Sequence, residues 1–403
     1  MMKIYTLTSA LHDAAKVDRL GDEFLSSIGL DFEIKGADFS DYDGGLIYVR
    51  TGGSEGIFKS LLPDLPKHRP FYLLTSGKSN SLAASMETLS YLRQQGLRGE
   101  ILHGSPDRLR ERILSIESTE SALKKLRSVR LGVIGRPSDW LISSGADYDL
   151  VREKSGIELI DIPMEELTGR IREVGALPEE IAAIPCRREE KVAPALRGAY
   201  AIYLALKEIA GVYNLDGLTL RCFDLLTSVK NTGCLGLALL NSEGIVATCE
   251  GDIPAMLSMA FAMALTGCPG FQCNPAEISP EKREILFAHC TLPLSMARKY
   301  NFDTHFESGI GAGIHGEIPE GPVTIFKLSG DLSRAFIQEA SLISNDYGDN
   351  LCRTQIRIRL PEGSYAIGEY FLKDPIGNHH IIIPGCHAAG LKDLFESIPK
   401  KNP

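Results

Sequence analysis

The run LIYVRTGG at residues 46–53, followed by FYLLTSG at residues 71–77, decides the fold of the first third of the chain. Both runs are short and apolar and end in glycine and hydroxyl residues, and a helical pattern begins at Ser81. Short apolar strands that alternate with helices are typical of a parallel sheet covered by helices. Ligands usually bind at the carboxyl ends of such strands, so Thr51 and Ser76 are expected at a ligand-binding edge.

A second α/β unit is predicted to begin at LGVIGRPSDW, residues 131–140, where a new apolar strand runs into a glycine turn. A long amphipathic helix around residues 193–211 and the apolar strands LTLRCF and IVATCE follow, and the strand-like segments FQCNP and ILFAHC are grouped with them. The most apolar stretch, residues 253–266, stops at Gly267 and is shorter than the ~20 residues that span a bilayer. It is predicted to be a buried helix, and no membrane association is expected.

Beyond residue 291 the pattern changes to strands without helices between them. Isoleucine and leucine alternate with arginine along IRIRL at residues 356–360, and this period of two favours an antiparallel sheet or barrel. The expected fold is therefore α/β, with Rossmann-like parallel-sheet domains at 1–127 and 128–290. A C-terminal antiparallel β-barrel-like domain at 291–403 is expected to complete the active site.

Composition limits the class of protein. The chain has 403 residues, enough for two or three domains at roughly 100–200 residues each. Its net charge is −9 and its basic residues are dispersed, so no nucleic-acid partner is expected. The nine cysteines begin at Cys186 and form no CxxC pair, which favours reduced intracellular thiols. The N-terminal residues do not read as a signal peptide, so a cytoplasmic protein is expected.

Carboxylates follow one of the strands of the second unit. Glu250 and Asp252 in CEGDIP come directly after an apolar strand and before a helix, so at least one is expected to face the crevice above the sheet. Asp252 is equally well explained as the cap of the helix whose first position is Pro254. His289 ends a nearby strand, and GNHH at residues 377–380 brings two more imidazoles. Carboxylate, amide and imidazole donors suit Mn²⁺, Co²⁺ or Mg²⁺.

Two glycine-rich segments have both a functional and an ordinary interpretation. HFESGIGAGIHGE at residues 305–317 is a candidate substrate-binding loop, and the alternative is a common glycine-rich turn. TGGSEG at residues 51–56 lacks the spacing of the nucleotide-binding glycine motifs, so a sugar hydroxyl or a simple turn is favoured there. A nucleotide-dependent dehydrogenase is correspondingly disfavoured.

Several motifs together resemble the L-fucose and L-arabinose isomerase family. The resemblance covers nearly the whole chain and is clearest from about residue 215 to 390, in the segments CEGD 249–252, NP 274–275, AHC 288–290, THFESGIG 304–311, CRTQ 352–355 and GNHH 377–380. TGG 51–53, NSLAASMETL 80–89 and GRPSDWLI 135–142 extend it to the first half. The resemblance implies an aldose–ketose isomerase, an intramolecular oxidoreductase of carbohydrate metabolism that usually uses Mn²⁺. It also implies a homo-oligomer, a trimer or hexamer, with active sites between subunits.

Carried over position by position, the family's metal ligands fall on Glu250, Asn274 and His380, with His289 as an additional ligand, and the choice between His380 and its neighbour stays open. Asn274 departs from the family, which has an acid there; an amide oxygen can bind a metal but cannot act as a base. The catalytic residues are expected to be Glu250, as ligand and base, together with Asp252 and His289. Asp252, His289 or Glu307 would supply the second proton carrier.

The residues expected to contact the sugar are His305, Glu307, Arg353, Asn378 and His379. The resemblance leaves the sugar open among a pentose, a 6-deoxyhexose such as fucose, and a 6-substituted hexose such as sulfoquinovose. A sulfonate would require a cation, for which Arg136, Arg353 and Lys230 are candidates beside an ordinary structural or surface role. A non-catalytic sugar-binding or regulatory protein on the same scaffold is the alternative, and the missing acid at Asn274 motivates it.

Overall fold

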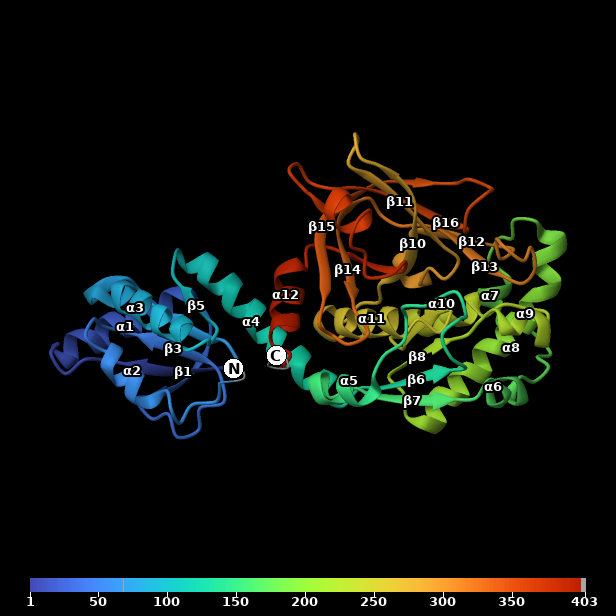
Figure 1. The fold of residues 1–403 in the computed structure, drawn as a ribbon. Coiled ribbons are helices and arrows are strands. Elements are labelled where there is room, and N and C mark those ends of the chain that lie inside the picture. Colours follow the sequence, from blue (N-terminus) through green and yellow to red (C-terminus); the bar gives the residue numbers. More distant parts are fainter. Residues whose placement is uncertain (68, 400–403) are drawn as a thin grey trace. The chain divides into compact units, whose positions relative to one another are not determined.

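The computed structural model describes residues 1–67 and 69–399. The chain forms two compact units, the first ending at Ser118 and the second beginning at Thr119. Helix α4 (Pro106–Leu126) carries the chain from one unit into the other. The second unit contains a parallel sheet and a barrel (Figure 1). Within the described residues no helix is both long enough and apolar enough to cross a membrane.

The first unit is a doubly wound parallel sheet with strand order β2-β1-β3-β4-β5. Its apolar strands are buried from both sides, because helices α2 and α3 pack on one face and α1 and α4 on the other. The predicted helix from Ser81 is α3. The elements are β1 (Met2–Leu7), α1 (Ala14–Ile28), β2 (Phe32–Gly36), β3 (Leu46–Val49), α2 (Glu55–Leu61), β4 (Phe71–Leu74), α3 (Ser81–Gln94) and β5 (Gly99–Leu102).

The parallel sheet of the second unit has the order β7-β6-β8-β9, and all its pairs are parallel. Helices α8 and α10 pack on one face of this sheet and α11 on the other. The strands are β6 (Arg130–Ile134), β7 (Glu158–Ile162), β8 (Gly217–Leu220) and β9 (Val246–Cys249). The helices are α5 (Tyr148–Ser155), α6 (Met164–Arg170), α7 (Glu179–Ala182), α8 (Glu189–Tyr213), α9 (Asp224–Ser228), α10 (Cys234–Ser242) and α11 (Ile253–Thr266).

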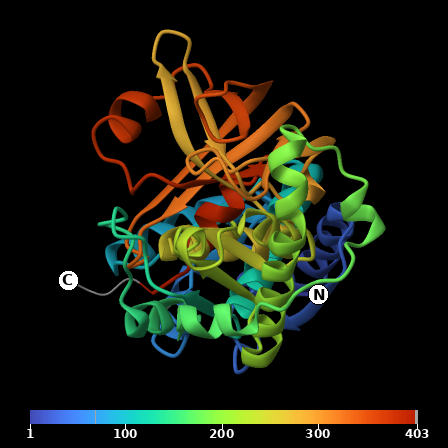
Figure 2. The same ribbon diagram turned by 90° about the vertical axis from the view of Figure 1, so that its right-hand side faces the viewer.

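Helix α11 is the apolar segment predicted to be buried, and it lies between the sheet and the barrel (Figures 1 and 2). Asp252 caps its N-terminus, and Gly267 ends it in the left-handed conformation. Its side chains share one apolar core with Phe326 and Leu328 of the barrel and with Val246 of the sheet. The helix therefore holds the two layers together and sets the height of the barrel above the sheet.

The barrel is closed and antiparallel, in the order β10-β11-β16-β15-β14-β17, and a separate hairpin, β12–β13, lies beside it. The parallel sheets and the antiparallel barrel agree with the expected fold class. The strands are β10 (Phe271–Ser279), β11 (Glu284–His289), β12 (Lys299–Asp303), β13 (Gly313–Glu317), β14 (Gly321–Leu328), β15 (Ala335–Asp346), β16 (Thr354–Arg359) and β17 (His380–Pro384), and helix α12 (Ala388–Glu396) follows.

One grouping made from the sequence changes in the structure. FQCNP and ILFAHC, grouped with the central sheet, form β10 and β11 of the barrel. The physical reason is the short link between Ser279 and Glu284, which joins antiparallel neighbours, whereas parallel strands need a long crossover. His289 therefore reaches the site from the barrel and not from a neighbouring strand of the central sheet.

Candidate active site

The carboxyl end of β9 is built around a tight turn. Glu250 and Gly251 both have positive φ, 66° and 68°, and the Glu250 carbonyl accepts a hydrogen bond of 2.9 Å from the Ser138 backbone N–H. A Cβ on Gly251 would lie 2.4 Å from the carbonyl oxygen of Arg136, so only glycine fits there. The turn thereby fixes the loop after β6 against the end of β9, with Glu250 between them.

Three buried side chains from separate elements meet at this turn. Glu250 follows β9, His289 ends β11, and His379 directly precedes β17. Their ligand atoms all lie within 4.8 Å of one another. Glu250 Oε1 is 3.4 Å from His379 Nε2 and 3.8 Å from His289 Nε2. Among the described residues, this is the group of acids, histidines and cysteines whose spacing could hold a metal ion.

Both imidazoles are oriented by a partner on the opposite ring nitrogen. His379 Nδ1 is 2.8 Å from Asp252 Oδ2, and His289 Nδ1 is 2.9 Å from Thr291 Oγ1. A proton on Nδ1 leaves the Nε2 lone pair free, the tautomer that a metal-ligating histidine needs. His379 Nε2 is itself buried and has no hydrogen-bond partner within residues 1–67 and 69–399. A carboxylate, two imidazole nitrogens and this unpaired atom fit a divalent cation.

The electrostatics of the cluster keep Glu250 ionised. Burial works against its charge, but His379 and His289 outweigh that effect and hold the pKa of Glu250 well below its usual range. Burial likewise lowers the pKa of His379, whereas Glu250 and Asp252 raise it to about 9. The site thus concentrates negative charge that needs a nearby cation.

An aromatic wall borders the cluster. The Trp140 indole N–H donates a 2.7 Å hydrogen bond to Glu250 Oε2, so the two carboxylate oxygens face different groups. Trp140 packs edge-on against Phe223 at 4.7 Å, and Phe223 packs edge-on against His305 at 5.5 Å. Trp140 is 52% exposed, so the wall is open to an incoming molecule. Burial lowers the pKa of His305, against the charges of Glu307 and Glu250.

The structure brings His379, and not His380, to Glu250. His380 lies among Phe287, Phe371 and Tyr370, with Nε2 2.9 Å from the Tyr370 hydroxyl and Nδ1 2.9 Å from the Asn378 carbonyl. Burial lowers the pKa of His380 to about 3. Neighbouring side chains of an extended segment point to opposite sides, so only one of the two histidines can face the cluster.

Asn274 and Asp252 hold other residues in place. Asn274 Oδ1 accepts a 3.0 Å hydrogen bond from Asn378 Nδ2, which fixes the residue before His379. Asp252 Oδ1 accepts from the Ala255 backbone N–H at 2.8 Å, as the capping interpretation expects. Asp252 Oδ2 lies 2.8 Å from His379 Nδ1, and the Asp252 side chain is fully buried. Asp252 therefore lies on the side of the imidazole that faces away from Glu250.

The remaining sequence candidates are Arg353, which lies directly before β16, Glu307 on the loop after β12, and two surface residues, Arg136 and Lys230. Arg353 is buried and donates from Nε to the Thr304 carbonyl at 2.8 Å, which anchors the start of the loop. Glu307, farther along it, is exposed. Arg136 is exposed beside Asp139, at 3.4 Å, and Lys230 is exposed as well.

Four residues of the site were not singled out from the sequence: Trp140, Phe223, Thr291 and Lys327. Trp140 lies in the turn after β6, the carboxyl end where a ligand is expected, and it is the single tryptophan of the chain. Lys327 is a charged residue inside the apolar strand TIFKL, and that contrast was a usable signal. Thr291 follows His289 by two residues and carries no signal of its own.

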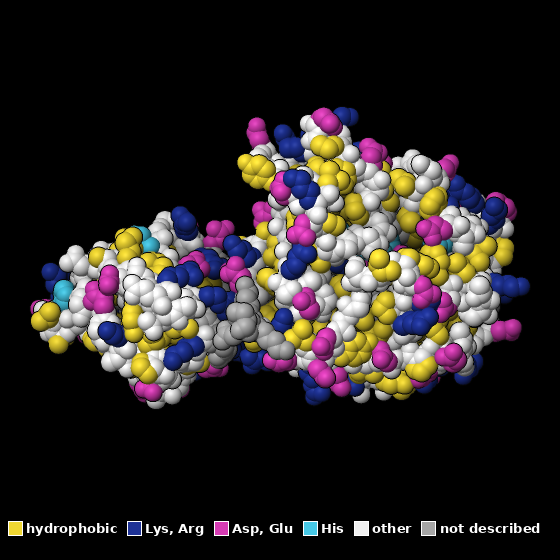
Figure 3. All heavy atoms as spheres, in the orientation of Figure 1, with side chains coloured by type: hydrophobic (Ala, Val, Ile, Leu, Met, Phe, Trp, Pro, Cys, Tyr) yellow, Lys and Arg dark blue, Asp and Glu magenta, His cyan; other side chains and the backbone are white. Residues whose placement is uncertain are grey.

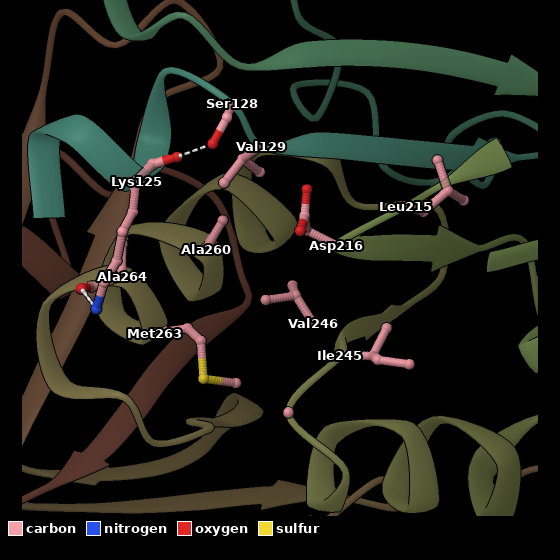
Figure 4. A pocket seen from close by; sticks show the side chains of 11 residues that line it. Lys125, Ser128, Val129, Leu215, Asp216, Ile245, Val246, Ala260, Met263 and Ala264 are labelled. Atoms are coloured by element: carbon pink, nitrogen blue, oxygen red, sulfur yellow. Dashed lines mark hydrogen bonds between the residues drawn. The ribbon is translucent and has the colours of Figure 1, made fainter. Parts of the chain in front are cut away.

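A pocket of about 440 Å³ lies at the amino ends of the strands in the parallel sheet of the second unit (Figure 4). Val129, Asp216 and Val246, at the amino ends of β6, β8 and β9, line it together with Lys125, whose ammonium is 3.5 Å from the Ala264 carbonyl. Ligands of parallel sheets bind at the carboxyl ends, so this pocket is not the active-site candidate.

Figure 3 shows acidic and basic side chains interspersed on the face in view.

Comparisons with known proteins point to one chemistry. No family model matches the chain. A sulfoquinovose isomerase of Alkalicoccus urumqiensis is 24% identical over 336 residues, which cover 79% of this chain and 74% of that protein. One of Priestia aryabhattai is 26% identical over 267 residues, 62% of this chain and 59% of that protein. One of Clostridium sp. (strain MSTE9) is 28% identical over 214 residues, 50% and 45% of the two chains. The similarities support an isomerase, and therefore an enzyme.

Proposed function

We propose that this protein is a metal-dependent aldose–ketose isomerase whose divalent cation is held by Glu250, His289 and His379. The observation that carries the proposal is the convergence of these three buried side chains within 4.8 Å. Nitrogen and oxygen donors suit Mn²⁺, Co²⁺ or Mg²⁺, whereas a closed structural zinc site would use thiolates. Asn274 holds Asn378 and thereby supports His379 from the neighbouring strand.

In this proposal the two carboxylate oxygens of Glu250 have different roles. Oε1 faces the imidazoles, and Oε2, which accepts the indole N–H of Trp140, faces the aromatic wall. A divalent cation held by Glu250, His289 and His379 would supply Lewis-acid polarisation of a sugar carbonyl and would stabilise the negative charge that develops there. Glu250 Oε2 takes the proton from C2 of the aldose and returns one to C1, and a proton moves from O2 to O1. No external oxidant or reductant is needed.

The substrate that we propose first is a hexose with a sulfonate at C6. The support is the name of the related proteins, the sulfoquinovose isomerases. The sugar would lie along Trp140, Phe223 and His305, because the C–H faces of sugars pack on aromatic rings. His305, whose pKa is lowered by burial, would hydrogen-bond a hydroxyl.

The test is a panel of aldoses with Mn²⁺ in heavy water, read by NMR. We expect ketose formation from sulfoquinovose and slower or no reaction with L-fucose, L-arabinose and glucose. Deuterium from solvent should appear at C1 of the ketose, because the proton that Glu250 takes can exchange. Turnover of fucose or arabinose in preference to sulfoquinovose would contradict the proposed substrate. If the protein binds metal but converts none of the aldoses, the proposed isomerase reaction is wrong.

Trp140→Phe tests the aromatic wall. Phenylalanine keeps an aromatic ring, smaller than the indole, and removes the N–H that donates to Glu250 Oε2. A hydrogen bond to a charged group contributes about 1.5–3 kcal/mol, so we expect kcat/KM to fall about 10- to 100-fold. Because Trp140 is the sole tryptophan, Co²⁺ added to the unaltered protein should quench its fluorescence. Unchanged kinetics and unquenched emission with metal bound would contradict this placement.

A further inference from the structure

Lys327 is a buried ammonium close to the proposed metal site. It lies on β14 with its side chain 1% exposed, on the same side of the strand as Val323 and Ile325, which belong to the apolar core of the barrel. A buried ammonium is strongly disfavoured unless a carboxylate accompanies it. Its presence in an otherwise apolar strand therefore requires an explanation.

The partner of Lys327 is the residue behind His379. Lys327 Nζ is 3.5 Å from Asp252 Oδ2, and the Asp252 side chain is fully buried. Nζ has no hydrogen-bond partner among the described residues, so this ion pair is its main stabilising contact. Gly377 lies beside the ammonium, and a Cβ there would be 4.0 Å from Nζ, an ordinary van der Waals contact. The ammonium is thus directed at one oxygen of one carboxylate.

That oxygen is shared with the imidazole. Asp252 Oδ2 lies 2.8 Å from His379 Nδ1, and His379 Nε2 lies 3.4 Å from Glu250 Oε1. His289 has only the neutral hydroxyl of Thr291 in the corresponding place. The two imidazoles therefore differ: the orientation of His379 depends on a charged pair buried behind it.

We infer that Lys327 is a positioning residue, which acts through Asp252 to hold the His379 ring with Nε2 towards Glu250. This inference rests on the proposed function. A buried carboxylate needs compensating positive charge. Lys327 supplies that charge at Asp252 Oδ2, the same oxygen that lies 2.8 Å from His379 Nδ1, and so holds the carboxylate in place behind the ring. Without Lys327 the buried Asp252 carboxylate would lose its partner charge, and the His379 ring that it orients would be held less firmly.

The experiment measures Co²⁺ binding by calorimetry and by the visible spectrum of bound Co²⁺, at one fixed pH. Lys327→Met keeps the volume and removes the charge; we expect the Kd to rise about 10- to 100-fold, the range for partners of metal ligands, with an altered Co²⁺ spectrum. Lys327→Arg should restore much of the affinity. In an Asp252→Asn background, Lys327→Met should cause no further loss, because its route to the metal is already removed.

The outcomes separate this inference from the proposed function. If the unaltered protein binds no Co²⁺, the proposed metal site fails first. If it binds Co²⁺ and Lys327→Met has the same Kd and spectrum, Lys327 is merely structural. Equal losses from Lys327→Met in the presence and absence of Asp252 would also overturn the inference. If Lys327→Met does not fold, Lys327→Gln takes its place, because its amide can still donate to Asp252 but carries no charge; a Kd and Co²⁺ spectrum like those of the unaltered protein would then overturn the inference.

Discussion

Replacing Glu250 by glutamine should lower the turnover of the isomerase about 10³- to 10⁴-fold, the upper part of what a positioned base contributes. The amide keeps the shape of the side chain and its hydrogen bond from Trp140. It removes the negative charge that faces His289 and His379, and it cannot accept the proton from C2. Both the affinity for metal and the chemical step should therefore suffer.

The measurement is kcat at saturating Mn²⁺ and sugar, with the metal content of the same sample. Glu180→Gln, an exposed position on helix α7, is the matched control and should retain full activity. A Glu250→Gln protein that binds metal and turns over at nearly the normal rate would eliminate Glu250 as the base. Near-UV circular dichroism of both variants establishes that the fold is kept.

Replacing His379 and His380 by glutamine, one at a time, should give opposite results. His379→Gln removes a proposed ligand, and we expect the Mn²⁺ Kd to rise by more than about a hundredfold, beyond the range for outer partners. His380→Gln should change the Kd by less than about threefold but lower the free energy of unfolding by about 1–3 kcal/mol. The reason is its contacts with Phe287, Phe371 and the Tyr370 hydroxyl inside the barrel.

Calorimetric titration with Mn²⁺ and urea unfolding measure the two effects on the same preparations, and each variant serves as the control for the other. The reverse pattern, tight binding in His379→Gln and loss in His380→Gln, would support the ligand set that the family resemblance implies. It would contradict the set proposed from the geometry.

Much of the fold was accessible from the pattern of residues. The apolar runs at residues 46–49 and 71–74 are strands, and the apolar segment after Asp252 is a buried helix with the expected cap and glycine end. These features depend on neighbours in sequence, through periodicity, capping and turn chemistry. The assignment of FQCNP and ILFAHC to the barrel depended on which strands pair, and strand pairing is not local.

The sequence by itself determined the alternating α/β units, the antiparallel pattern that follows them, and a short set of candidate metal ligands that includes Glu250 and His289. Only the tertiary structure decided that His379 faces Glu250 while His380 enters the barrel. It alone showed that Lys327 reaches Asp252. The physical reason is that successive side chains of a strand point to opposite faces. Which of the two faces lies inside the barrel depends on how the barrel closes over helix α11, and this closure is a property of the tertiary structure.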